Sequence, residues 1–258
     1  MRVIISPAKK MRVDRDSFSC RDLPRFLQKT DILLERLRGM SEAELQKLWK
    51  CNDKIASENI ERLQRMELRS GLTPAIYAYE GIQYQYMCPN VFTDEELEYI
   101  QEHLRIISGF YGILRPFDGV TPYRLEMQAK LPVGDTKDLY GFWESEIAEA
   151  LFSETDCVIN LASKEYSQCV FKYLPKTARM ITCVFGEKLN GKIVEKGTMC
   201  KMARGEMVRF MAEQRIRDPE QLKEFGGLGY TYSAADSEND RYVFLKNTKE
   251  DVDEACFG

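Results

Sequence analysis

The chain has only one histidine, His103, and its eight cysteines form no Cys-x-x-Cys pair. Zinc ribbons, His-rich metal sites and small disulfide frameworks depend on such ligands, so the sequence favours none of them. We expect reduced thiols, no bound metal and no cofactor. Catalysis by a Ser-His or Cys-His pair would have to use His103. We expect His103 to be a structural residue at the end of a helix instead.

The sequence also lacks a long hydrophobic run. No apolar segment approaches the roughly 18–20 residues that span a membrane, and the apolar run at the start is too short for a signal peptide. The hydrophobic content of 44% and the charged content of 30% are ordinary for a soluble globular protein. We therefore expect a cytoplasmic protein without a membrane partner.

No repeat or linker divides the 258 residues, and a chain of this length can bury a large core without disulfides. Predicted strands alternate with predicted helices. This alternation indicates an α/β fold, with a mixed sheet and flanking helices in a single domain over residues 1–258. The acidic end, residues 250–258, is expected to fray. The sequence does not indicate an oligomeric state, and we take the protein as a monomer.

Local patterns predict the individual elements. The predicted helices cover residues 24–38, 41–49, 54–66, 93–107, 139–152 and 198–215, with capping boxes that begin at Ser41 and Thr93. The predicted strands cover residues 2–5, 74–79, 123–127, 157–162, 178–185, 192–195, 230–232 and 241–246, with a hairpin turn at Asn190-Gly191.

Polar side chains follow two of the predicted buried strands. Residues 2–5 lead into Ser6 and Lys9, and residues 157–162 lead into Ser163. In open α/β sheets, ligands gather at the carboxyl ends of the strands. Asn160 lies inside the second strand, and a buried amide needs hydrogen-bond partners. Asn160 is therefore either a structural clamp or a group that binds a ligand.

Residues 103–127 combine glycines and arginines more densely than any other part of the chain. Gly109 and Gly112 bracket a tight bend of the kind that can approach a phosphate. Arg105, Arg115 and Arg124 lie at predicted turn and strand positions, and Pro116 favours an extended backbone at Arg115. This stretch is either a binding site or a crowded structural corner.

Charge is unevenly distributed along the chain, although the net charge is only −4. Residues 162–217 hold twelve basic and five acidic residues, and residues 1–15 hold five basic residues and one acidic residue. On the predicted helix 198–215, Lys201 and Arg204 lie opposite the apolar stripe. The sequence therefore predicts a basic patch on an acidic body, although several of these lysines can equally serve solubility.

Six segments carry a family likeness: Ile-Ser-Pro-Ala-Lys at 5–9, Leu-Arg-Ile-Ile-Ser-Gly-Phe-Tyr-Gly-Ile-Leu-Arg-Pro-Phe-Asp at 104–118, Pro-Tyr-Arg-Leu-Glu-Met at 122–127, Asp-Leu-Tyr-x-Phe-Trp at 138–143, Val-Ile-Asn-Leu-Ala-Ser-x-Glu-Tyr at 158–166 and Ala-Arg-Gly at 203–205. Together they resemble the YaaA family of bacterial peroxide-stress proteins. The resemblance implies a cytosolic protein of the hydroperoxide response that limits iron-linked oxidative damage. It also implies a positively charged cleft and a helix-hairpin-helix-like element that binds double-stranded DNA.

The position of that hairpin element is open. Residues 103–118 contain the glycine bend, but Gly109 and Gly112 depart from the usual Gly-hydrophobic-Gly spacing, and Pro116 disfavours a following helix. The helix pair predicted at residues 41–50 and 53–66 is the alternative.

Two functions fit these residues, and DNA binding is favoured over the other. A protein that contacts DNA phosphates would use cations at loops, strand ends and helix faces, with backbone N–H groups from the glycine bend. The residues are Lys9, Lys10, Arg105, Gly109, Gly112, Arg115, Arg124, Lys164, Lys201 and Arg204. An enzyme, or a protein that binds an anionic small molecule, would instead use a polar pocket. Its residues would be Ser6, Lys9, Arg115, Tyr123, Arg124, Glu126, Asn160, Ser163, Glu165 and Tyr166.

Overall fold

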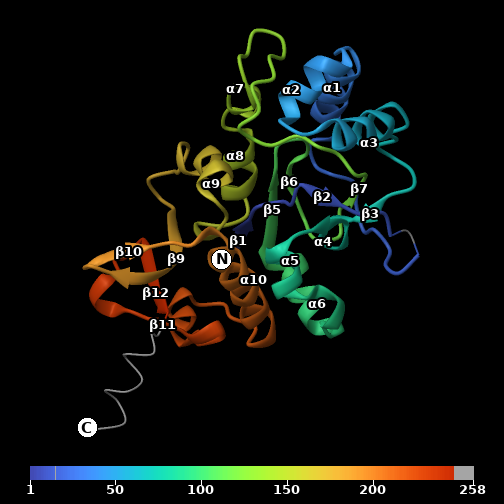
Figure 1. Ribbon diagram of the computed structural model, residues 1–258. Coiled ribbons are helices and arrows are strands. Elements are labelled where there is room, and N and C mark those ends of the chain that lie inside the picture. Colours follow the sequence, from blue (N-terminus) through green and yellow to red (C-terminus); the bar gives the residue numbers. More distant parts are fainter. Residues whose placement is uncertain (15, 247–258) are drawn as a thin grey trace, which may run out of the picture.

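The fold is built around an eight-stranded mixed sheet, seen in a computed structural model that describes residues 1–14 and 16–246 (Figure 1). The strand order is β11-β12-β9-β8-β1-β5-β6, with β10 paired to β9. The strands are β1 (Arg2–Ile5), β5 (Leu104–Ser108), β6 (Gly112–Leu114), β8 (Cys157–Leu161), β9 (Arg179–Leu189), β10 (Lys192–Val194), β11 (Tyr230–Tyr232) and β12 (Arg241–Lys246). The predicted fraying of residues 250–258 lies outside the described residues.

The centre of the sheet is parallel. β1 pairs in parallel with both β5 and β8, β8 pairs in parallel with β9, and β9 pairs in parallel with β12. The edge strands β6 and β11 are antiparallel to their neighbours. Parallel strands need crossover connections, which the helices between them provide. The expected α/β architecture with a mixed sheet is confirmed.

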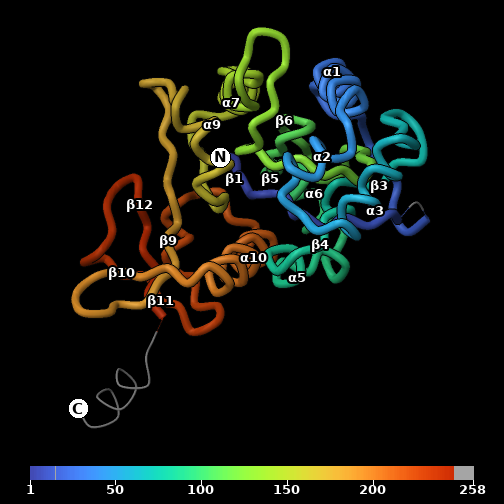
Figure 2. The backbone as a smooth tube through the Cα atoms, turned by 45° about the horizontal axis from the view of Figure 1, so that its top comes forward, coloured from blue at the N-terminus to red at the C-terminus, as the bar shows by residue number. Residues whose placement is uncertain are grey.

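Helices flank the sheet on both sides. The helices are α1 (Leu27–Arg38), α2 (Glu42–Trp49), α3 (Asp53–Gln64), α4 (Ala75–Ala78), α5 (Ile82–Met87), α6 (Asp94–His103), α7 (Leu139–Trp143), α8 (Glu146–Phe152), α9 (Lys164–Phe171) and α10 (Gly197–Glu213). In Figure 1, α8 and α9 lie above β1, and α5, α6 and α10 lie below it. Figure 2 shows α1 and α3 at one end of the molecule and the strands β9 to β12 at the other.

Two small sheets lie beside the large one. β2 (Lys10–Met11) pairs with β4 (Tyr79–Glu80), and β3 (Thr73–Pro74) pairs with β7 (Gly119–Val120). The first of these holds the loop after β1 against the segment that leads into α5. This pairing matters for function because it fixes the position of Lys10 next to Glu80.

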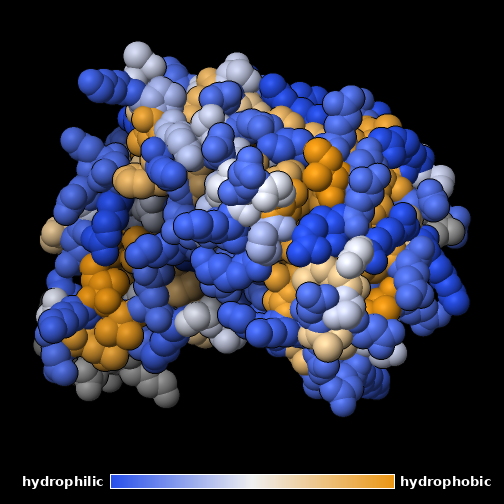
Figure 3. Space-filling model, turned by 90° about the horizontal axis from the view of Figure 1, so that it is seen from above, coloured by the Kyte–Doolittle hydropathy of each residue, from blue (hydrophilic) through white to orange (hydrophobic). Residues whose placement is uncertain are grey.

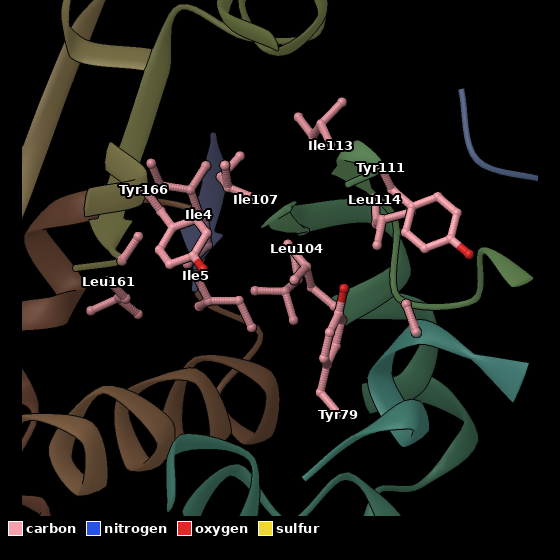
Figure 4. Close-up of a cluster of buried hydrophobic side chains, with 14 of the residues drawn as sticks. Ile4, Ile5, Tyr79, Leu104, Ile107, Tyr111, Ile113, Leu114, Leu161 and Tyr166 are labelled. Carbon is pink, nitrogen blue, oxygen red and sulfur yellow. The ribbon is translucent and has the colours of Figure 1, made fainter. Parts of the chain in front are cut away.

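The hydrophobic core lies on both faces of β1 and its neighbours. Figure 4 shows Ile4 and Ile5 of β1 close to Ile107 of β5, Leu161 of β8 and Tyr166 of α9. All five side chains are buried. Apolar contacts therefore surround the parallel strands on which the candidate site stands.

The starts of α2, α3 and α6 were predicted well because capping is local. In the capping box of α2, the Ser41 side chain accepts from the Glu44 backbone N–H, and the Glu44 carboxylate accepts from the Ser41 backbone N–H at 2.8 Å. Thr93 and Glu96 form the same box at α6, and Asn52 caps α3. The hairpin turn at Asn190 is also confirmed.

The helix predicted over residues 93–107 is wrong at its end. α6 stops at His103, and Leu104–Ser108 forms the fully buried strand β5 between β1 and β6. Over so few residues, the apolar stripe of a helix and a continuous apolar strand have similar sequence patterns. Residues 104–108 form a strand, which is buried on both faces of the sheet. His103 itself ends α6 as expected, and its Nδ1 lies 3.0 Å from the Met1 carbonyl oxygen.

Three other expected elements are wrong. The strand predicted over residues 74–79 is largely the short helix α4, and no strand forms over residues 123–127. The helix predicted over residues 139–152 is broken into α7 and α8 at Glu144, whose φ is +42°. Each of these segments packs against distant parts of the chain, which local propensity does not report. Helix starts also shifted slightly, because α1 begins at Leu27 rather than residue 24 and α10 begins at Gly197.

No helix among the described residues is both long and apolar enough to cross a membrane. The surface agrees with this, because hydrophilic side chains cover most of the face in Figure 3 and the apolar atoms between them form separate patches.

Candidate functional site: a basic pocket at the carboxyl ends of two parallel strands

A cavity of about 410 Å³ lies where β1 and β8 end. We call it the basic pocket. Its lining residues are Ser6, Pro7, Ala8, Lys9, Lys10, Glu80, Gly81, Ile82, Gln83, Tyr84, Tyr123, Arg124, Leu125, Glu126, Ser163, Glu165, Tyr166, Lys201 and Arg204. The volume is in the range of small-molecule sites, and the position is the one at which open α/β sheets bind ligands.

The floor of the pocket is held by hydrogen bonds between the ends of β1 and β8. The backbone N–H of Ser163 donates to Ser6 Oγ at 2.9 Å, and the two hydroxyl oxygens lie 3.3 Å apart. Tyr84 of α5 donates its hydroxyl to the Ser6 carbonyl oxygen at 3.0 Å. The loop after β1, the start of α9 and the helix α5 are therefore tied together at Ser6.

The segment that carries Arg124 and Glu126 is placed by the glycine bend after β5. A side chain at Gly109 would bring its Cβ to 2.8 Å from the Leu125 carbonyl oxygen, closer than real Cβ atoms come to backbone. Trp143 Nε1 also donates to the Gly109 carbonyl oxygen at 3.0 Å. Gly109 is thus required for backbone packing behind the pocket, which explains a glycine there without a bound phosphate.

The opposite wall comes from α10, which packs closely on α5 (Figures 1 and 2). At Gly205 a Cβ would lie 2.1 Å from the Gln83 carbonyl oxygen, so only glycine allows the two helices to approach this far. The close approach brings Lys201, one turn before the contact, and Arg204, immediately before it, to the pocket.

Lysines and carboxylates form ion pairs at the pocket entrance. Lys9 Nζ lies 2.8 Å from Glu126 Oε1, and Lys10 Nζ lies 2.8 Å from Glu80 Oε2. Both lysine side chains are exposed, so each pair contributes little to stability and can open when another anion arrives.

The two arginines of the pocket have unsatisfied hydrogen-bond donors. The Nε atoms of Arg124 and Arg204 are buried and have no hydrogen-bond partner among the described residues. The nearest carboxylate to Arg204 is that of Glu195, 3.6 Å from Nη2. Buried N–H groups usually have partners, so these two guanidinium groups can accept an added anion at low cost.

Acidic and phenolic groups occupy the inner part of the pocket. Burial raises the pKa of Glu165, the backbone N–H of Gln128 acts against this shift, and nearby Glu126 adds to it. Burial raises the pKa of Tyr123 to about 12, and its hydroxyl lies 2.7 Å from Ser108 Oγ and 2.9 Å from the Tyr79 hydroxyl. The tyrosines therefore stay protonated near neutral pH, and Glu165 binds a proton more readily than an exposed glutamate.

Two residues expected in a polar pocket lie elsewhere. Asn160 is buried beneath the pocket, where its Nδ2 donates to Thr182 Oγ1 at 3.2 Å and its Oδ1 accepts from the Ala162 backbone N–H at 3.0 Å. It is the structural clamp of the two alternatives. Arg115 lies outside the pocket, near Glu154 at the start of β1 and β5.

Arg2, Arg105 and Arg115 surround one carboxylate, and we call these three residues with Glu154 the Glu154 cluster. Both Arg2 Nε and Arg105 Nε donate to Glu154 Oε2 at 3.0 Å. Burial opposes ionisation of Glu154, but Arg105 and Arg2 outweigh it and hold the pKa of the carboxyl below its usual value. Arg105 is only 3% exposed, so its expected place on a phosphate-binding surface is wrong.

The glycine bend is also not a phosphate site. Gly109 and Gly112 are enclosed by backbone and by the rings of Trp143 and Phe26, so their N–H groups face no open surface. Within residues 103–118, β5 and β6 form a β-hairpin over residues 104–114, so a helix-hairpin-helix element cannot lie there. The α2–α3 pair is the remaining helical hairpin of the two alternatives, and its Lys50 and Lys54 are exposed.

Of the residues expected to contact DNA, Lys9, Lys10, Arg124, Lys201 and Arg204 line the basic pocket together. Lys164 is exposed at the start of α9, directly after the lining residue Ser163. Of the residues expected in a polar pocket, Ser6, Lys9, Tyr123, Arg124, Glu126, Ser163, Glu165 and Tyr166 line the same cavity. The two hypotheses therefore share one place in the fold.

Comparison with known proteins agrees with the sequence motifs at the pocket. The family model for peroxide stress protein YaaA matches residues 1–236. The chain belongs to the YaaA family of peroxide stress proteins. Its relatives include UPF0246 proteins of Agathobacter rectalis, 52% identical over 244 residues, and of Desulfitobacterium hafniense, 52% identical over 250 residues. These alignments cover 95% and 97% of this chain, and 98% and 100% of the relatives.

The YaaA motifs map onto the pocket. The segments 5–9, 122–127, 158–166 and 203–205 supply Lys9, Arg124, Ser163 and Arg204, among other lining residues. Sequence reasoning missed the wall formed by Glu80, Ile82, Gln83 and Tyr84, because the aromatic run after Gly81 has no clear period. The only signal there was Gly81 itself, whose position is packed against Ala8 in the loop after β1.

Thiols and metal ligands do not gather at this site. The seven described cysteines are all free, and burial raises the pKa of Cys169 and of Cys183 to about 12. In the described part of the chain, no three His, Cys, Asp or Glu residues are grouped so that they could hold a metal ion.

Proposed function

We propose that this chain binds double-stranded DNA at the rim of the basic pocket and thereby limits iron-linked damage to DNA during peroxide stress in the cytoplasm. The observation that carries the proposal is the convergence of cations from three separate segments on one cavity. Of these, Arg124 and Lys201 form no ion pair with any described residue. Cations without partners bind phosphates and release counterions when they do so.

We propose the α2–α3 pair as a second place of contact with DNA. It is a helix hairpin with exposed Lys50 and Lys54. Helical hairpins bind the DNA backbone through N–H groups and lysines, a mode that carries no sequence preference. We therefore propose binding through charge and shape, by a monomer.

Salt dependence tests this proposal. The double variant Lys164→Gln and Lys201→Gln removes two exposed cations that form no salt bridge with any described residue. Lys201 lines the pocket, and Lys164 directly follows the lining residue Ser163. The slope of log K against log[salt] should flatten by up to about two units, because each lost phosphate contact releases about one fewer counterion. The matched control is Lys176→Gln with Lys192→Gln, which changes the net charge equally at exposed positions away from the pocket.

The control should keep the wild-type slope. Equal flattening in both double variants would mean that net charge alone attracts DNA, and an unchanged slope in the pocket variant would remove the pocket from the DNA surface.

A second candidate function is binding of an anionic small molecule in the same pocket. The volume of the cavity and the carboxyl groups of Glu126 and Glu165 in its lining favour it, since carboxylates repel a DNA backbone. Equilibrium titration with free nucleotides and with inorganic phosphate, in the absence of DNA, would detect it.

A further inference from the structure

The basic pocket has an outer and an inner part of different chemistry. Lys9, Lys10 and Lys201 are exposed at its rim. The rings of Tyr84, Tyr123 and Tyr166 are buried and line it from inside. Exposed cations suit a phosphate backbone that passes over the opening, while tyrosine rings suit a flat, uncharged group that enters it.

The carboxyl group of Glu165 adds a second requirement. It lines the pocket, and burial, with nearby Glu126 adding to the effect, raises its pKa, so a phosphate beside this group is unfavourable. A carboxyl group can instead accept hydrogen bonds from amino and imino N–H groups and, when protonated, donate to ring nitrogens or carbonyl oxygens. These are the edges of a nucleobase.

The two arginines are intermediate in exposure between the lysines and the tyrosines of the pocket. The unpartnered Nε atoms of Arg124 and Arg204 are buried, whereas the lysines around them are in solvent. A guanidinium group can grip a phosphate through two parallel hydrogen bonds, which fixes the phosphate at one position. A nucleotide whose base entered the pocket would place its own phosphate near this level.

We propose that the basic pocket takes up one nucleobase everted from duplex DNA, with the adjoining phosphate held by Arg124 and Arg204. This inference rests on the proposed DNA-binding function and names what enters the pocket. Eversion replaces base stacking with stacking on tyrosine and exchanges base pairing for hydrogen bonds to the pocket. It requires a cavity of this size, which a protein that only follows the backbone does not need.

The free energy needed to evert a base is smallest where the base is already mismatched. The wild-type protein should therefore bind a duplex with one central mismatch at least about five-fold more tightly than the fully paired duplex. A third duplex, with abasic sites in both strands at that position, is equally interrupted but offers no base. It should show no such preference, because flexibility alone fills no pocket.

A pocket-filling variant gives an independent check. Ile82 lines the pocket and is half-buried at the start of α5, so Ile82→Trp reduces the volume without changing charge. The mismatch preference should fall to about one-fold in this variant. Val91→Trp adds the same ring at an exposed position outside the pocket and should keep the preference.

The outcomes separate the two proposals. If no duplex binds, the DNA-binding function fails and eversion fails with it. If paired duplexes bind but the mismatched and the doubly abasic duplexes bind alike, DNA binding stands and eversion is overturned. If deoxyadenosine monophosphate binds as tightly as the mismatched duplex, the pocket serves a free nucleotide, and eversion is again overturned. Because the three-duplex comparison uses only the wild-type chain, it holds even if Ile82→Trp does not fold.

Discussion

Two groups of arginines lie at opposite ends of the central parallel strands. They differ in how far their guanidinium groups are satisfied by partners within the protein. In the Glu154 cluster, Arg2 and Arg105 share one carboxylate at 3.0 Å. In the basic pocket, Arg124 and Arg204 keep buried Nε atoms without a partner. A guanidinium group that is neutralised inside the protein stabilises the fold, whereas one without a partner is available to a ligand.

The comparison shows why arginine content alone is a poor guide to function. Arg105, Arg115 and Arg124 occur within twenty residues, and all three look equivalent in the sequence. Only the position of Glu154, far along the chain in the turn after α8, distinguishes them. The partner, rather than the arginine, decides which group is structural.

The largest effect is expected from breaking the Glu154 cluster. Arg105→Ala leaves Glu154 without its closest cation in a buried setting, and the free energy of unfolding should fall by roughly 3–5 kcal/mol. Arg124→Ala should change it by less than about 1 kcal/mol, because Arg124 has no ion pair to lose. Urea denaturation of both variants measures this difference. Equal destabilisation would contradict the division into structural and available arginines.

A smaller loss of stability is expected where α10 meets α5. Gly205→Ala places a Cβ against the Gln83 carbonyl oxygen and should cost about 1–3 kcal/mol through forced separation of the helices. DNA affinity should fall as well, since α10 carries Lys201 and Arg204. Gly197→Ala in the same helix meets nothing within 4 Å and serves as the control for thermal melts and DNA titrations.

The two carboxyl groups should respond to pH in opposite directions. The pKa of Glu154 is lowered in the folded state, so its stabilising effect is present above the ordinary value of 4.5 and is lost as the pH falls through the folded pKa. Glu154→Gln should therefore be less stable than wild type at pH 7, with a difference that shrinks on acidification.

Glu165 has a raised pKa in the folded state, so its ionisation costs stability as the pH rises through that pKa. Glu165→Gln should be at least as stable as wild type at pH 7, and the difference should vanish in acid. Melting temperatures of wild type and both variants, measured from pH 7 down to about pH 3 so that the range extends below the ordinary carboxyl pKa, are the measurement. Parallel curves for the two variants would show that their environments do not differ.

The smallest effect is expected from replacing the cysteines, of which none that the structure describes belongs to the Glu154 cluster or lines the basic pocket. Burial raises the pKa of Cys169 and Cys183 to about 12, and thiols with such values are poor nucleophiles. Single Cys→Ser variants at all eight positions should keep peroxide protection in cells. Loss of protection in a variant that folds stably, with a sulfenic acid detected on the wild-type thiol, would overturn this expectation.

Much of the fold could be predicted because its signals are local. Ser41, Thr93 and Asn52 begin helices through contacts within three residues, and the alternation of strands and helices indicates the sheet. The errors arise where distant packing decides. The strand β5 was predicted as part of a helix, because only burial between β1 and β6 distinguishes the two.

Part of the candidate site could also be predicted from local signals, and the rest depends on contacts between distant residues. Ser6 and Ser163 follow buried strands, so their meeting could be inferred from the rule for strand ends. The approach of α10 to α5 depends on one glycine, Gly205, and the place of Asn160 depends on Thr182 in the next strand. Neither contact leaves a pattern in the sequence near the residue concerned.

The most direct test of the central claim is the salt dependence of duplex binding in two arginine double variants. Arg124→Gln with Arg204→Gln removes the two guanidinium groups of the pocket whose Nε atoms have no partner, and Arg25→Gln with Arg115→Gln removes two arginines that line a separate cavity together with Glu154. The account predicts that the first pair flattens the slope of log K against log[salt] by roughly two units and that the second pair leaves it unchanged. A flattened slope in the second pair with a wild-type slope in the first would place the DNA surface at the Glu154 cluster and contradict the account.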